Sequence, residues 1–109
     1  MTFKIVKDLT FTRNVPVHIP TDDGHREQTL RTKFRVLEDE SDQVSLIDNP
    51  GNKAFIKKIV VEFSDVEGAD GKARPHSDAL VDELLGLPFV RAALVSMYFR
   101  EITKVQAGN

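Results

Sequence analysis

Histidines, carboxylates and serines are the residues of this sequence that could perform chemistry, but their spacing forms no reactive set. The three histidines, His18, His25 and His76, lie far apart, and none has a second histidine at the spacing of metal ligands. The chain contains no cysteine, so it can form neither a thiolate metal site nor a disulfide framework. We therefore expect turn or surface histidines and no bound metal.

Acidic residues gather around one serine in the stretch EDESD, which begins at Glu38. Such a cluster could attract a cation, but it lacks the alternating ligands and the turn glycine of a calcium-binding loop. Acidic side chains also favour the first turn of a helix, where the backbone dipole attracts negative charge. The sequence therefore predicts a short helix with a solvated start between Glu38 and Asp48.

Phosphate binding and nucleophilic catalysis are not indicated either. The stretch GADGK, between Gly68 and Lys72, lacks the Gly-Lys-Ser/Thr ending and the preceding strand of a phosphate-binding loop. No serine has the flanking glycines of a nucleophile elbow. We expect no catalytic residue and no cofactor, and the chain is not predicted to be an enzyme.

The first elements that position these residues are two runs of alternating apolar and polar residues on either side of an Asp-Gly turn. This pattern predicts a β-hairpin with strands over about 9–19 and 29–37. Pro16 and Pro20 remove backbone donors from the first strand, which is typical of the edge of a sheet. A lone hairpin is marginal in water, so helices are expected to cover its apolar face.

Helical patterns follow the hairpin. Asn52 is suited to cap a helix over about 53–67; its IVVEF run is β-branched and compatible with a strand, but the longer period favours a helix. Ser77 is suited to cap a helix over about 77–85, which Gly86 ends, and Pro88 begins a last helix over about 88–104. We predict a single α+β domain over 1–109, with a hairpin and three to four helices, the last two forming a tight helical hairpin.

The formal net charge of −2 argues against a nucleic-acid-binding protein, which normally carries a basic surplus. Arg26, Arg31, Lys33 and Arg35 are expected to form a basic strand face, which a solvated sheet surface explains. No apolar run is long enough to span a membrane, and the first residues lack the apolar run of a signal peptide.

The last helix carries large apolar side chains over roughly 200° of its circumference, at about 100° per residue. A helix that packs on a single core needs a stripe of about 100°. Two interpretations stay open: a central helix contacted by several elements, or a helix that also contacts another subunit or a partner. We predict an interface at residues that are equally suited to the core: Leu84, Leu85, Phe89, Leu94, Tyr98 and Phe99.

Three segments resemble the tail assembly chaperones of long-tailed, non-contractile bacteriophages and prophages. They are FTRNVPVHIPTDDGHREQTLRTKFRVL, AFIKKIVVEFSDVEGADGKARPHSDALVDELL and LPFVRAALVSMYFREI, and the last is similar to the closing PYVRAAL…AYF helix of that family. His76 stands where the family usually has an aromatic ring, and VVEF replaces a more usual Gly-Trp ending.

The resemblance implies an assembly protein in the cytoplasm of the bacterial host. Such a protein binds the tape measure protein, helps recruit tail tube subunits and forms a homo-oligomer, without nucleic acid or membrane as partner. Two alternatives stay open: a permanent structural component of the tail or neck, and a small regulatory nucleic-acid-binding domain.

Overall fold

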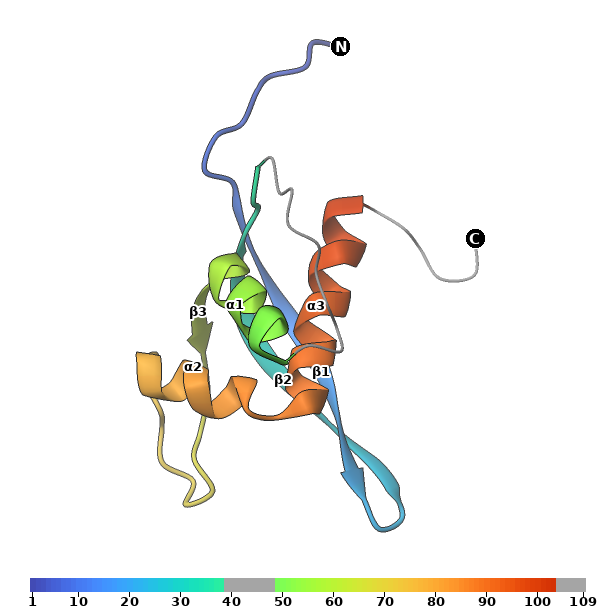
Figure 1. The fold of residues 1–109 in the computed structure, drawn as a ribbon, viewed down its shortest axis with the longest axis vertical. Helices are drawn as coiled ribbons and strands as arrows, with labels where there is room; N and C mark the ends of the chain where they lie inside the picture. The colour runs from blue at the N-terminus through green and yellow to red at the C-terminus, as the bar shows by residue number, and fades with distance from the viewer. Residues whose placement is uncertain (39–48, 104–109) are drawn as a thin grey trace.

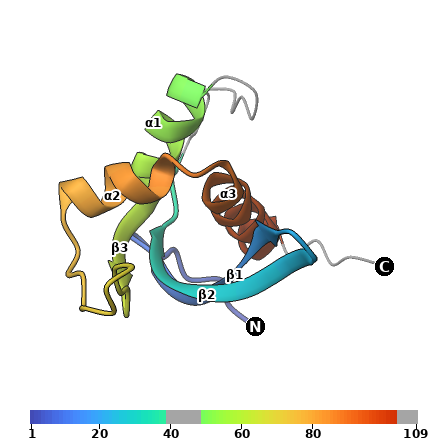
Figure 2. The ribbon, with the colours of Figure 1, turned by 90° about the horizontal axis from the view of Figure 1, so that it is seen from below.

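A three-stranded antiparallel sheet with helices on one face makes up the fold. The computed structural model describes residues 1–38 and 49–103. In this part of the chain the strand order is β1-β2-β3, and the sheet curves around the last helix (Figures 1 and 2). The α+β prediction is confirmed. The elements are β1 (Thr10–Thr21), β2 (Gly24–Arg35), α1 (Asn49–Ile59), β3 (Val60–Ser64), α2 (Asp78–Leu85) and α3 (Pro88–Thr103).

The predicted hairpin is confirmed, and its strands meet closer to the turn than expected. β1 and β2 pair from Thr10 opposite Arg35 to Thr21 opposite Gly24, so only two residues separate the strands. Gly24 has a φ of 137°, a conformation that residues with a side chain rarely adopt. The predicted strands, 9–19 and 29–37, stop short of the turn because the polar residues there have no apolar alternation, whereas backbone pairing does not require it.

β3 corrects the prediction of one helix over about 53–67. The helix α1 ends at Ile59, and Val60 begins a strand that pairs with β2 between Arg31 and Phe34. Phe34 lies opposite Val60 and Lys33 opposite Glu62, so Val61 is an extra residue that forms a β-bulge. The bulge lets Val60 and Phe63 both face the core although they are three residues apart. A spacing of three residues is also typical of one face of a helix, which is why the sequence pattern favoured a helix here.

Two smaller predictions about the middle of the chain have different outcomes. The sequence suggests Asn52 as a cap that precedes a helix, but α1 already begins at Asn49, and Asn52 is buried within it. The predicted helix between Glu38 and Asp48 lies almost wholly outside the described residues. The described part of the chain therefore contains three helices.

The joint between α2 and α3 follows the local signals of the sequence. The Ser77 hydroxyl accepts a hydrogen bond of 3.1 Å from the Leu80 N–H and caps α2. Gly86 and Leu87 alone separate α2 from α3, which begins at Pro88. The two helices are close, as predicted, and α2 runs across the end of α3 to form a corner (Figures 1 and 2).

A buried arginine holds this corner together. Arg91 Nη1 donates a hydrogen bond of 2.7 Å to the carbonyl oxygen of Leu85, at the end of α2. The last carbonyls of a helix have no partner within the helix and carry partial negative charge, so a guanidinium suits this position. Arg91 is buried although it lies on an otherwise apolar face of α3.

Candidate protein-binding surfaces

Three of the six residues that the sequence suited equally to an interface or to the core are buried within the chain. Tyr98 is at the centre of an aromatic cluster with Phe11, Phe34 and Phe55, at ring-centroid distances of 5.8 to 6.5 Å. Its hydroxyl accepts a hydrogen bond of 3.1 Å from the Leu37 N–H, just after β2. The sheet and α1 thus fill the part of the α3 arc that sequence alone left open. The interior residues of the six are Leu85, Leu94 and Tyr98.

The other three residues reach the surface and line pockets there. Leu84 and Phe89 are half-buried and line a pocket at the corner between α2 and α3. Phe99 is 38% exposed, stacks on Phe55 at 5.8 Å and lines a different pocket along α3. Phe89 also lines a pocket that shares Ala92 and Ser96 with the pocket of Phe99, so these two residues of the set are linked along α3.

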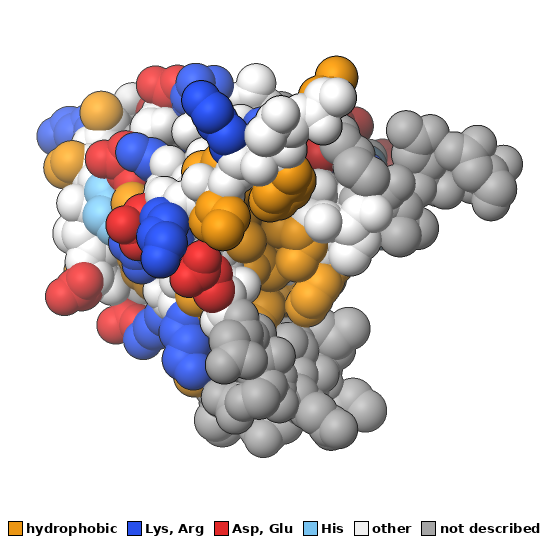
Figure 3. Space-filling view, turned by 90° about the horizontal axis from the view of Figure 1, so that it is seen from above, with side chains coloured by type: hydrophobic (Ala, Val, Ile, Leu, Met, Phe, Trp, Pro, Cys, Tyr) orange, Lys and Arg blue, Asp and Glu red, His pale blue; other side chains and the backbone are white. Residues whose placement is uncertain are grey.

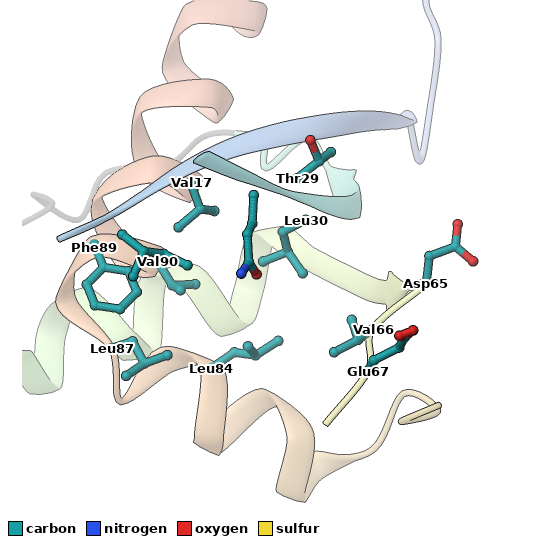
Figure 4. Close-up of a pocket in the computed structure, with 12 residues that line it drawn as sticks. Val17, Thr29, Leu30, Asp65, Val66, Glu67, Leu84, Leu87, Phe89 and Val90 are labelled. Carbon is teal, nitrogen blue, oxygen red and sulfur yellow. The ribbon is translucent and has the colours of Figure 1, made fainter. Parts of the chain in front are cut away.

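The corner pocket lies between the hairpin, the segment after β3 and the α2–α3 corner (Figure 4). Its volume is about 180 Å³. Asp65 and Glu67 place two carboxylates on one side of an otherwise largely apolar wall. We define the corner pocket by its lining residues: Val17, Ile19, Gln28, Thr29, Leu30, Asp65, Val66, Glu67, Leu84, Leu87, Phe89 and Val90.

Local geometry explains how distant residues meet there. Val17 and Leu30 lie on the helix-facing side of the hairpin because alternate residues of a strand point to the same side. Asp65 has a φ of 56°, which turns the chain away from β2 after β3. The Leu87 N–H donates to the Leu84 carbonyl at 3.1 Å, and Leu87 stays 39% exposed at the pocket.

A second groove runs along α3 beside Phe99. It has a volume of about 350 Å³ and combines small and large side chains. Ala92 and Ser96 are exposed there, whereas Val95 is buried behind them. We define the α3 groove by Asn52, Pro88, Arg91, Ala92, Val95, Ser96 and Phe99.

The hairpin extends beyond the third strand and leaves part of β2 open. β3 pairs with β2 only from Arg31 to Phe34, so in the described chain no strand lies beside residues 24–30 on that side. Backbone groups alternate in direction along an antiparallel strand, and Thr21 and Gly24 close the two-residue turn. The N–H and C=O groups of His25, Glu27 and Thr29 therefore point away from β1, into this open edge.

The residues before β1 form an extended segment with exposed apolar side chains. We call residues 1–9 the leading arm; it points away from the hairpin turn (Figure 1). Phe3 is 88% and Ile5 77% exposed. The space-filling view from this end shows hydrophobic side chains open to solvent, with charged residues on one side (Figure 3). Sequence reasoning missed the arm, although the alternation of Phe3 and Ile5 was a usable signal.

The uncovered face of the sheet is basic, with one correction to its predicted members. Arg31, Lys33 and Arg35 share that face because they are two residues apart along β2. Arg26 lies on the opposite face, since its position along β2 differs from theirs by an odd number and side chains alternate along a strand. Lys33 lies across from Glu62 of β3, which offsets part of the positive charge.

Histidines and carboxylates do not converge in the described residues. No three of them are placed to hold a metal ion there. His76 is exposed, and its Nδ1 accepts a hydrogen bond of 3.0 Å from the Phe63 N–H of β3. This histidine therefore satisfies a backbone donor on the outer edge of the sheet, which is a structural role.

Comparisons with models of known protein families, with curated proteins and with solved structures found no match. Within residues 1–38 and 49–103, no helix is both long and apolar enough to cross a membrane.

Proposed function

We propose that this chain is a non-catalytic assembly chaperone of a long-tailed phage or prophage, acting in the cytoplasm of the bacterial host. In this role it binds the tape measure protein and helps recruit tail tube subunits before the tail is complete. The resemblance of the hairpin, the middle segment and the closing helix to that family supports the proposal.

The observation that carries a protein-binding role is the α3 groove, which lies on the helix most similar to the family. Phe99 stays 38% exposed at one end of it, and exposed Ala92 and Ser96 leave room for a close approach. An amphipathic helix presents apolar side chains three and four residues apart, which suits a groove between small and large side chains. A tape measure protein is long and helical before the tube encloses it, so it offers such faces repeatedly.

Co-expression with the tape measure protein of the same phage tests the proposal. We expect a soluble complex with the intact chain and reduced capture with Phe99→Ser. Val61→Ser is the matched control, because Val61 is partly exposed but lies in neither the α3 groove nor the corner pocket. The absence of any complex, with both proteins folded and soluble, contradicts the chaperone function.

A permanent structural component of the tail is the second candidate, because the open edge of β2 suits strand addition between neighbouring subunits. Purified virions distinguish the two candidates: a chaperone is absent from them, whereas a structural subunit is present in stoichiometric amounts. A gene position between a tail tube gene and a very long tape measure gene agrees with the first.

A further inference from the structure

The leading arm and the open edge of β2 are complementary, and we propose that the arm of one copy adds as a strand to β2 of a second copy. Phe3 or Ile5 then enters the corner pocket. This inference rests on the homo-oligomeric part of the proposed function and gives it a mechanism. Each copy donates residues 1–7 to the next copy in a head-to-tail arrangement.

The arm has the properties of an unpaired strand. It belongs to no helix or strand in the single chain, and pairing as a strand would place Phe3 and Ile5 on one side and Lys4 on the other. Phenylalanine, isoleucine and valine favour strands. Among the described residues, the first backbone hydrogen bond from this region to the body is made by the Leu9 carbonyl, which accepts from the Val36 N–H at 3.0 Å. Asp8 has a φ of 55°, which separates the arm from the direction of β1.

The receiving edge has the properties of an incomplete sheet. His25, Glu27 and Thr29 present backbone donors and acceptors without an intervening proline, in line with the end of β3. The opposite edge of the hairpin is β1, where Pro16 and Pro20 interrupt the outward-facing donors. Strand addition near the turn is therefore favoured on β2 and disfavoured on β1.

Size and charge agree with this occupant. The corner pocket measures about 180 Å³, and an apolar cavity of about 150 Å³ is enough to hold a benzene ring, so one phenyl or branched side chain fits. When Phe3 or Ile5 faces the pocket, Lys4 faces the other side of the sheet, where Glu27 lies. Asp65 and Glu67 add negative charge near the pocket, and Lys7 adds positive charge to the arm.

Geometry favours a second copy over the arm's own body. The arm leaves the body at the end of the hairpin opposite the turn (Figure 1). The pocket residues Val17 and Ile19 lie well along β1 from its first residue, Thr10, and at about 3.3 Å per residue this separation is roughly 25 Å. To return, the arm would have to cross the half of the β2 edge that β3 already occupies. A head-to-tail contact of this kind closes into a ring or continues as a filament.

Light scattering after size-exclusion chromatography tests the proposal over a series of protein concentrations. We expect the intact chain to form oligomers and a chain lacking residues 1–7 to be monomeric. Phe3→Ser is expected to raise the dissociation constant by roughly tenfold to a hundredfold, as removal of one large apolar contact does. An intact chain that stays monomeric at high concentration, or a truncated chain with unchanged mass, overturns the proposal.

Two proline variants locate the receiving edge. Glu27→Pro removes an outward donor from β2, and His18→Pro removes one from β1; these two residues lie opposite each other and share no ladder hydrogen bond. We expect Glu27→Pro to be monomeric and His18→Pro to assemble normally, with circular dichroism showing that both are folded. If the two variants lose assembly to the same extent, or if Glu27→Pro still forms oligomers, strand addition at β2 is contradicted.

Mixing supplies a readout that a folding defect cannot produce. The chain lacking residues 1–7 keeps the receiving edge, and the Glu27→Pro chain keeps the arm. Each is expected to be monomeric alone, and the mixture is expected to form a one-to-one dimer. A mixture that stays monomeric overturns the exchange. These assays use this chain alone, so their failure is distinct from a failure to capture the tape measure protein.

Discussion

The division of the α3 arc into interior and surface can be tested by comparing Leu94→Ala with Phe99→Ala. Sequence alone places both residues in one predicted interface. In the structure, Leu94 is fully buried, whereas Phe99 is 38% exposed. The two substitutions should therefore have very different effects on the stability of a single chain.

The expected magnitudes follow from this burial. Truncation of a buried leucine to alanine removes its transfer free energy and leaves a cavity, which together lower the free energy of unfolding by about 2–5 kcal/mol. For a domain of this size that corresponds to a fall in Tm on the order of 10–20 °C. Phe99→Ala should lower the free energy of unfolding by about 1 kcal/mol, because less apolar area is lost and alanine favours the helix.

Urea unfolding followed by circular dichroism measures both values, at two protein concentrations. A loss that belongs to the interior of one chain does not change with concentration, whereas a loss at a subunit interface does. If Leu94→Ala has an unchanged unfolding midpoint as a monomer and only reduces the mass of an oligomer, Leu94 is an interface residue and the assignment to the core is refuted.

Three further substitutions and one control substitution test the local interactions by the same unfolding assay. Arg91→Met should lower the free energy of unfolding by about 1.5–3 kcal/mol, because it removes a charged donor from the Leu85 carbonyl; an unchanged midpoint means that Arg91 does not hold the corner. Ser77→Ala should lower the free energy of unfolding by about 1 kcal/mol through loss of the α2 cap. The control Ser96→Ala, at an exposed position of α3, should have little effect, and equal losses of stability in the two variants argue against the cap. Lys57→Ala should change it by less than about 1 kcal/mol, because the ion pair with Asp82 is exposed to solvent, and a larger loss indicates a role that burial does not explain.

Interactions between near neighbours were predictable from the sequence. The alternation on either side of an Asp-Gly turn predicts the hairpin, because period two places every second side chain on one face. The Ser77 cap and the Gly-Leu-Pro joint depend on residues within a few positions, and both lie where the sequence places them. The α+β class follows from these elements and from the need to cover one face of the hairpin.

Only the tertiary structure decided the features that depend on distant residues. The strand β3 exists because β2 offers it an edge, and the bulge at Val61 gives its core residues the spacing of a helix. Tyr98 is interior because Phe11, Phe34 and Phe55 surround it, and Arg91 is buried because α2 ends beside it. The open edge of β2 exists because β3 ends at Ser64 and is shorter than the strands of the hairpin. The pattern of apolar and polar residues within one strand does not reveal how long its neighbour is.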